Sequence, residues 1–250
     1  MDEIIAKAVK EKDIDILVIV EPHEFPTNLL LTLNSEGNDF YYNADSCSHV
    51  QIFSKFIDPQ FSLIQEFDRT VGWKYRSPYG DSLNIIVTHF HDKFHNDEED
   101  QDVKLDELIK EIQIIEDSSD IDKTLLIGDL NIDPYNRLCY GPKGLNSIMC
   151  RKTVKRLGER KGRKLFYNAS WNLLGDKDHT PGTYYRTSAG TKYWSVLDQI
   201  MMRSGLIDQF DPSSIRVLNY IFEEALVSIN DIPRSEKYSD HLPIYFEIKI

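Results

Sequence analysis

Residues 124–131 read Thr-Leu-Leu-Ile-Gly-Asp-Leu-Asn, an apolar run that ends in a carboxylate and an amide. Such a run favours a short buried strand, and catalytic groups often lie on loops that a rigid sheet holds in place. Asp129 and Asn131 are therefore candidates for the rim of an active site. Gly, Asp and Asn also favour turns, so the motif taken alone has a purely structural alternative.

Other apolar runs carry polar residues of the same kind. Phosphoester hydrolysis needs a cation to neutralise the phosphate, an acceptor for the proton of the attacking water, and donors for the charge on the phosphoryl oxygens. Acids and histidines suit these tasks. They occur beside or within these segments: 16–20 with Glu21, 84–88 with His89, 196–200 with Asp198, and 244–248 preceded by Ser239-Asp240-His241.

In this order, the segments resemble the endonuclease/exonuclease/phosphatase superfamily, which includes deoxyribonuclease I and the abasic-site endonucleases. The similarity covers most of the chain. It implies an α/β fold, a four-layer sandwich of two mixed β-sheets packed face to face and flanked by helices, with the strand ends converging at one edge. Periodicity alone indicates only a mixed α and β domain.

The resemblance also implies a metal site and a phosphate site. Glu21 matches the glutamate that holds a divalent cation, Mg²⁺ or Mn²⁺, and Asp240 matches an aspartate that lies near this cation. His89 matches a histidine that donates to the phosphate. Glu21 and Asp240 are thus the expected metal ligands.

The remaining motif residues correspond to the groups that handle water and phosphate. Asp129 and Asn131 match the pair that positions both, and His241 matches the essential histidine, which Asp198 orients. A histidine beside a carboxylate has its charged form favoured, so this pair could carry a proton or hold a cation against the phosphate. Whether Asp129 or His241 is the general base stays open. Together with His89, these residues form the expected catalytic set.

The start of the chain departs from the superfamily pattern. Members normally open with a strand that carries an asparagine beside the metal glutamate, whereas residues 2–12 have the spacing of an amphipathic helix. Either the natural start lies upstream of Met1, or the protein does without this strand and its asparagine. We therefore expect a fold without the first strand.

Composition bounds the class of protein. With 250 residues and 41% hydrophobic side chains, the chain is long enough for one large core, which favours one domain over 1–250. No run approaches the roughly 18 apolar residues of a membrane helix, and no signal-peptide pattern opens the chain. Cys47, Cys139 and Cys150 lack metal-type spacing and indicate free thiols. We expect a cytoplasmic protein, and no protein partner can be deduced.

Charge bears on the substrate. A formal net charge of −12 argues against nucleic-acid binding over the whole surface, but residues 151–164 are strongly basic and precede an aromatic-rich stretch. Basic side chains suit phosphates, and aromatic rings suit bases. We therefore predict substrate contacts by Arg151, Lys152, Lys155 and Trp194. The alternatives are a solvated basic face and a core tryptophan.

The middle of the chain shows regular periodicity. Leu105, Leu108, Ile109, Ile112 and Ile115 have helical spacing, which predicts a crossover helix over a sheet. Strand-like runs occupy 39–44, 50–53, 61–67 and 83–88.

The leading hypothesis is a metal-dependent phosphodiesterase that acts on nucleic acid. A phosphatase for a small metabolite or lipid headgroup is the alternative enzyme, and a non-catalytic binding protein on the same scaffold is the alternative class. Residues 88–95 also invite comparison with di-metal hydrolases of the metallo-β-lactamase type. That spacing fails, because Asp92 directly follows the second histidine, His91.

Overall fold

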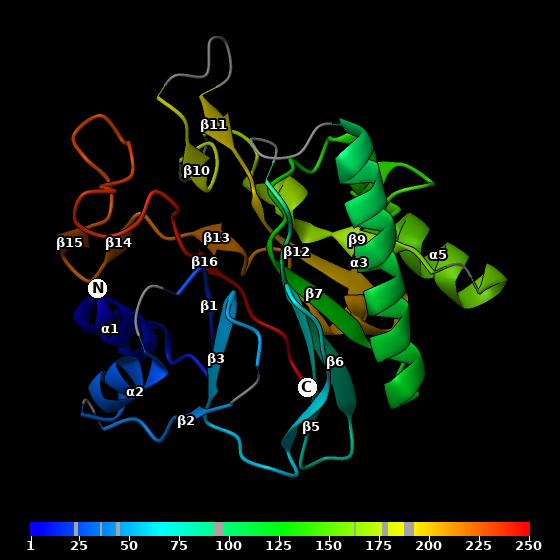
Figure 1. Cartoon of the computed structure of the whole chain (residues 1–250), viewed down its shortest axis with the longest axis horizontal. Helices are drawn as coiled ribbons and strands as arrows, with labels where there is room; N and C mark the ends of the chain where they lie inside the picture. Colours follow the sequence, from blue (N-terminus) through cyan, green and yellow to red (C-terminus); the bar gives the residue numbers. More distant parts are fainter. Residues whose placement is uncertain are drawn as a thin grey trace.

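The computed structural model describes residues 1–22, 25–35, 37–43, 46–92, 98–162, 164–176, 180–187 and 193–250. Its elements stack in four layers: two helices, a small sheet, a large sheet and a long outer helix (Figure 1). Within the described part of the chain, no helix is both long and apolar enough to cross a membrane.

The large sheet has seven strands in the order β4-β5-β6-β7-β12-β9-β8. It is mixed, because β6 and β7 run parallel, as do β8 and β9, while the other neighbours are antiparallel. The helix α3 (Glu98–Ser119) connects β6 to β7 and covers one face. The strands are β4 (Phe61–Glu66), β5 (Thr70–Arg76), β6 (Ser82–His89), β7 (Thr124–Asp129), β8 (Ser147–Ile148), β9 (Phe166–Asn168) and β12 (Asp198–Arg203).

The small sheet has three antiparallel strands in the order β1-β3-β2. Its strands are β1 (Ile16–Val20), β2 (Tyr41–Tyr42) and β3 (Val50–Ser54), and its outer face carries α1 (Asp2–Lys12) and α2 (Pro26–Ser35). Every residue of β3 is buried, whereas every residue of edge strand β1 is partly exposed. Within the described residues, β3 is the only strand that pairs with β1.

Short elements complete the chain. They are α4 (Arg137–Tyr140), α5 (Arg151–Lys161), η1 (Ala169–Leu173), β10 (Tyr184–Tyr185), β11 (Trp194–Ser195), η2 (Ser204–Gln209), β13 (Arg216–Val217), β14 (Tyr220–Ile221), β15 (Glu224–Ala225) and β16 (Ile244–Tyr245). The strands among them form three two-stranded sheets, β10-β11, β13-β16 and β14-β15.

Alternation along the strands builds separate cores on the two faces of the large sheet. In β6, Ile85 and Val87 join the cluster shared with the small sheet, while Ile86 joins the cluster beneath α3. A third cluster joins β3 to α1 and α2. Because both faces of β6 and β7 are covered, these strands have continuous apolar sequences rather than alternating ones.

The expected α/β sandwich is confirmed, and the expected helix over 2–12 matches α1. The small sheet is antiparallel rather than mixed. The sequence analysis did not predict β5, α2 or α5, and it extended two strands too far. The run 39–44 forms a strand only at Tyr41–Tyr42, with residue 44 outside the described residues, and the run 244–248 forms one only at Ile244–Tyr245.

Candidate active site

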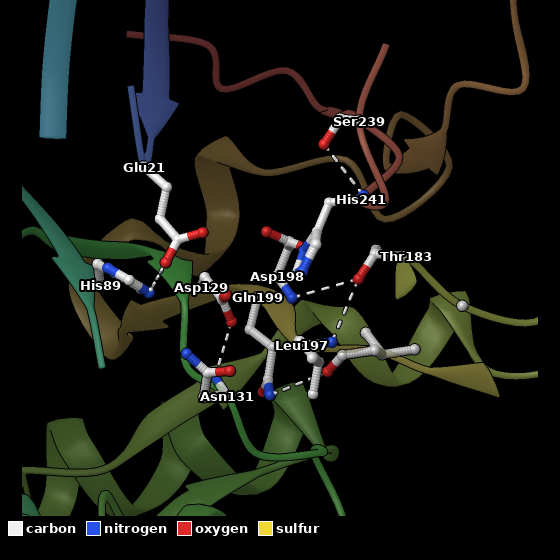
Figure 2. A network of polar contacts seen from close by, with 12 residues as sticks. Glu21, His89, Asp129, Asn131, Thr183, Leu197, Asp198, Gln199, Ser239 and His241 are labelled. Carbon is white, nitrogen blue, oxygen red and sulfur yellow. Dashed lines mark hydrogen bonds and ion pairs between the residues drawn. The ribbon is translucent and has the colours of Figure 1, made fainter. Parts of the chain in front are cut away.

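The strand ends meet in one row at the edge of the large sheet. His89 closes β6 and pairs in register with Asp129, which closes β7. Asp198 opens β12 and pairs with Asp129 from the other side. Glu21, directly after β1 in the small sheet, extends its carboxylate to His89 across the gap between the sheets (Figure 2). The predicted convergence is therefore present.

Gly128 allows β6 and β7 to approach closely here. Its φ of 137° lies outside the range that other residues adopt easily, and a Cβ at this position would lie 1.9 Å from the carbonyl oxygen of Thr88. The glycine is thus required by geometry, just before the residue that carries the central carboxylate.

Asp198 and His241 form an ion pair. Nδ1 of His241 lies 2.8 Å from Oδ2 of Asp198. Burial would lower the pKa of His241, but the carboxylates of Asp198, Asp129 and Asp240 outweigh it and raise this pKa to about 10. Burial likewise opposes ionisation of Asp198, yet the imidazolium keeps the pKa of Asp198 below its ordinary value. At neutral pH, His241 is therefore a cation and Asp198 an anion.

Asp129 is the most buried acid of the row, with 5% of its surface exposed. Burial, followed by the negative charge of Asp198, raises the pKa of Asp129 to about 7. Its Oδ1 accepts a hydrogen bond of 2.7 Å from the backbone N–H of Asn131. Asp129 can therefore exchange a proton near neutral pH, which a carboxylate in water cannot do.

Asn131 joins the ends of β6 and β7. Its backbone has a φ of 51°, in the left-handed region that asparagine tolerates better than most residues. Its side-chain Nδ2 donates a hydrogen bond of 2.8 Å to the carbonyl oxygen of Phe90, directly after His89. This contact uses one amide hydrogen and leaves the second for another acceptor.

His89 lies between the carboxylate of Glu21 and the guanidinium of Arg69. Its Nε2 is 3.1 Å from Oε1 of Glu21, and its Nδ1 is 3.2 Å from Nη1 of Arg69. Burial lowers the pKa of His89 to about 4; the Glu21 carboxylate opposes this shift, and the Arg69 guanidinium adds to it. His89 is consequently neutral under conditions in which His241 is charged.

Three buried side chains that the sequence analysis missed hold the site loops together. The Thr183 hydroxyl accepts from the backbone N–H groups of Leu197 and Asp198, at 3.2 and 3.3 Å. Gln199 donates to the carbonyl oxygen of Ile132 and, at 3.2 Å, to that of Val196. Asp133 accepts from the backbone N–H of Val196 at 3.1 Å. Because these partners are far apart in sequence, no local pattern marks them.

The donors at this edge suit a hard divalent cation. Asp129, Asp198 and His241 offer ligand atoms that lie within 4.8 Å of one another, but Asp198 and His241 already satisfy each other. Glu21 contacts His89 through one carboxylate oxygen, which leaves the other for a cation, and its side chain is 62% exposed. Asp240 is exposed and acts on the charge of His241. Carboxylate oxygens are the ligands that Mg²⁺ and Mn²⁺ prefer.

Trp194 lies on β11, where it pairs in register with Tyr185 of β10. It is partly buried against the main core, and its ring packs edge-on against Tyr185 with centroids 5.2 Å apart. Tyr184 forms a backbone bridge with His241, and their rings are 4.8 Å apart. Trp194 thus contributes to the core and also belongs to an aromatic group at the site edge.

The three basic residues expected to bind substrate lie elsewhere. Arg151, Lys152 and Lys155 belong to α5, which packs against η2, and η2 follows the end of β12 opposite to Asp198. The Arg151 guanidinium donates to the carbonyl oxygens of Ile207 and Phe210, and Lys155 pairs with Asp208. The structure does not bring these residues to the row of strand ends that contains His89, Asp129 and Asp198.

No protein-family model and no curated protein matches the sequence. Solved structures match its fold. An AP endonuclease from Archaeoglobus fulgidus superposes with a TM-score of 0.59 at 16% identity, over 100% of this chain and 94% of that one. The 3′ phosphatase NExo from Neisseria, bound to a product DNA hairpin, gives 0.59 at 15% identity, over 98% and 93%. Truncated Caenorhabditis elegans TDP2 gives 0.57 at 16%, over 98% and 90%. The chain therefore has the fold of endonuclease/exonuclease/phosphatase proteins.

Proposed function

We propose that this protein is a divalent-metal-dependent phosphodiester hydrolase that acts on nucleic acid. The observation that carries the proposal is the convergence of the acids, amide and histidines at one sheet edge, where burial and neighbouring charges shift their pKa values in opposite directions. Glu21, His89, Asp129, Asn131, Asp198 and His241 come from five separate segments, and the fold brings them together. Strongly shifted pKa values of this kind cluster at functional sites, where they provide proton donors and acceptors.

The charges favour Asp129 as the general base. A base must accept a proton at the working pH, and the pKa of Asp129 is about 7. His241 is already protonated, so it would instead stabilise negative charge on the phosphoryl oxygens. Neutral His89 and the second amide hydrogen of Asn131 supply further donors. Asp198 keeps His241 charged and oriented.

Glu21 and Asp240 would hold the cation, which is Mg²⁺ or Mn²⁺. The charges of both act on the buried residues: Glu21 raises the pKa of Asp129, and Asp240 raises that of His241. When bound, the cation would neutralise the phosphate and polarise its oxygens.

The substrate proposal rests on the aromatic hairpin and on the neighbouring structures. The Tyr184 ring lies next to His241, and Tyr185 and Trp194 pack together on the same strand pair; aromatic surfaces of this kind suit unpaired bases. Proteins of the same fold include one bound to a DNA hairpin. A small phosphorylated metabolite or lipid headgroup is the alternative substrate, and the net charge of −12 argues only against nucleic-acid binding over the whole surface. A non-catalytic binding protein is the third possibility, although the intact catalytic row speaks against it.

The first experiment is cleavage of labelled single-stranded DNA, duplex DNA, RNA and a chromogenic phosphodiester, each with Mg²⁺, Mn²⁺ or EDTA. Wild type is compared with Asp129→Asn and His241→Gln. His91→Gln is the matched control, because His91 follows the same strand and its ring contacts Phe90 rather than a residue of the row. We expect metal-dependent turnover that both site variants lose and the control keeps.

The ranking of substrates separates the hypotheses. A preference for polynucleotides over the chromogenic ester supports the nuclease. Turnover of small phosphoesters alone supports the phosphatase. Folded protein that binds nucleic acid without turnover under any metal condition supports the binding protein and contradicts the proposal.

A further inference from the structure

Arg69 lies directly across the strand pair from His89. The register of β5 with β6 pairs Thr70 with Thr88, so Arg69 and His89 are the next pair toward the active-site edge. The backbone N–H of His89 donates to the carbonyl oxygen of Arg69 at 2.9 Å. The Arg69 side chain also contacts His89: its Nη1 lies 3.2 Å from Nδ1 and 3.5 Å from the carbonyl oxygen of His89.

This contact determines which nitrogen of His89 carries the proton. A guanidinium has only donors, so Nδ1 of His89 must accept. A neutral imidazole that accepts at Nδ1 carries its hydrogen on Nε2. Nε2 faces Oε1 of Glu21, an acceptor, at 3.1 Å. Both neighbours therefore require the same Nε2–H tautomer.

We infer that Arg69 is a positioning residue, which holds His89 in the Nε2–H tautomer with that hydrogen toward Glu21. A substrate oxygen that binds beside Glu21 would then receive a hydrogen bond from a neutral ring that is already oriented. The tautomer itself does not depend on any reaction, and only the identity of the acceptor rests on the proposed function.

The other neighbours of Arg69 do not compete for this role. Asp68 lies 3.9 Å from its Nε, with a side chain that is 84% exposed, which makes a weak surface pair. The His49 ring is tilted by 54° against the His89 ring, with centroids 5.5 Å apart, and this contact is between rings rather than a hydrogen bond. Glu21 alone imposes the same tautomer, so an experiment must separate Glu21 from Arg69.

The test uses nitrogen-15 NMR of the histidine rings at neutral pH in four proteins: wild type, Glu21→Gln, Glu21→Gln with Arg69→Met, and Glu21→Gln with Arg76→Met. The glutamine removes the carboxylate, which leaves Arg69 to fix the ring. Arg76, at the far end of the same strand and exposed, provides the matched control. We expect a pyridine-like Nδ1 and a pyrrole-like Nε2 in the first two proteins and in the control.

Loss of Arg69 should change this pattern. In the Glu21→Gln, Arg69→Met protein, both ring nitrogens should move to intermediate shifts, because no neighbour then requires Nδ1 to accept. An unchanged Nε2–H tautomer in that protein overturns the inference, as does an Nδ1–H tautomer in wild type. A general loss of folding would appear in all histidine signals rather than in His89 alone.

Kinetics provide the second measurement. Arg69→Met should lower kcat between about 10- and 100-fold with little change in KM, as loss of an orienting outer-shell partner typically does. Arg69→Lys, which keeps a donor, should recover part of the loss. Unchanged kcat in Arg69→Met overturns the positioning role. A protein without any hydrolytic activity refutes the proposed function instead. The tautomer of His89 in the four proteins then still tests whether Arg69 positions the ring.

Discussion

The two ends of β12 both gather charge, but they use it differently. At the Asp198 end, the acids and His241 are crowded and partly or wholly buried, and their pKa values move in opposite directions. At the Arg203 end, cations bind local partners: Arg203 pairs with Glu116, Arg151 donates to backbone carbonyls, and Lys155 pairs with Asp208. The first arrangement provides groups with strongly shifted pKa values, and the second holds a helix in place. Charge density alone therefore does not identify a functional site.

The largest difference between the two ends should appear in catalysis. Asp129→Asn removes the proposed base and keeps an acceptor for the Asn131 N–H, so kcat should fall at least about 100-fold. Lys152→Gln with Lys155→Gln, at the other end, should leave kcat within about twofold. Steady-state kinetics on the preferred substrate checks both. A larger loss from the lysine variant would reverse the comparison.

The second prediction concerns the pH dependence of stability at the Asp198 end. The folded pKa of His241, about 10, is above the ordinary value of 6.5. The pair with Asp198 therefore stabilises the fold fully below about pH 6.5, and this contribution declines as pH rises toward 10. Asp198→Asn should cost about 2 kcal/mol at neutral pH, because a charged hydrogen bond is lost.

Urea unfolding at several pH values measures this effect. The cost of Asp198→Asn should shrink between neutral pH and pH 10, as His241 becomes neutral in wild type as well. A cost that does not change with pH would show that the pair is not ionised in the folded protein.

The third prediction separates activity from stability at Asp129. Its folded pKa of about 7 is above the ordinary value of 3.8, so the folded state holds a proton that the unfolded chain releases. Ionisation of this buried carboxyl therefore reduces stability as pH rises between these values. Asp129→Asn should be more stable than wild type above neutral pH, by on the order of 1 kcal/mol. Thermal unfolding across this pH range checks the sign, and a less stable variant contradicts it.

The pH profile of kcat should follow the same group. Activity should rise as Asp129 loses its proton around pH 7. Binding of a cation nearby should move the midpoint to lower pH, because positive charge favours the ionised form. A profile without an acidic limb would remove the support for Asp129 as the base.

The smallest effect is expected from α5. Arg151→Met leaves two carbonyl oxygens, those of Ile207 and Phe210, without this donor, and it should cost about 1 kcal/mol of stability. Lys152→Gln, at an exposed position of the same helix, should cost nothing measurable. Denaturant titrations of both variants compare them directly. Equal effects would show that α5 is not fastened through Arg151.

Sequence analysis predicted the part of the fold that local patterns encode. The apolar runs before His89 and Asp129 became β6 and β7, and the parallel register then placed these residues side by side. It missed β5, whose run contains a glycine and a lysine, and with it Arg69. Thr183 and Gln199 were missed because their partners lie in other loops. Arg151, Lys152 and Lys155, predicted to contact the substrate, lie away from the site, because a basic run carries no information on where its helix docks.

The central claim is that the row at the sheet edge performs metal-dependent hydrolysis with Asp129 as the base. Its most direct test is the cleavage rate of a labelled oligonucleotide by wild type and Asp129→Asn, each folded, with and without Mg²⁺ across the neutral pH range. The account predicts metal-dependent turnover in wild type that rises with pH around neutrality and is lost in the variant. Equal, pH-independent rates in the two proteins would contradict it.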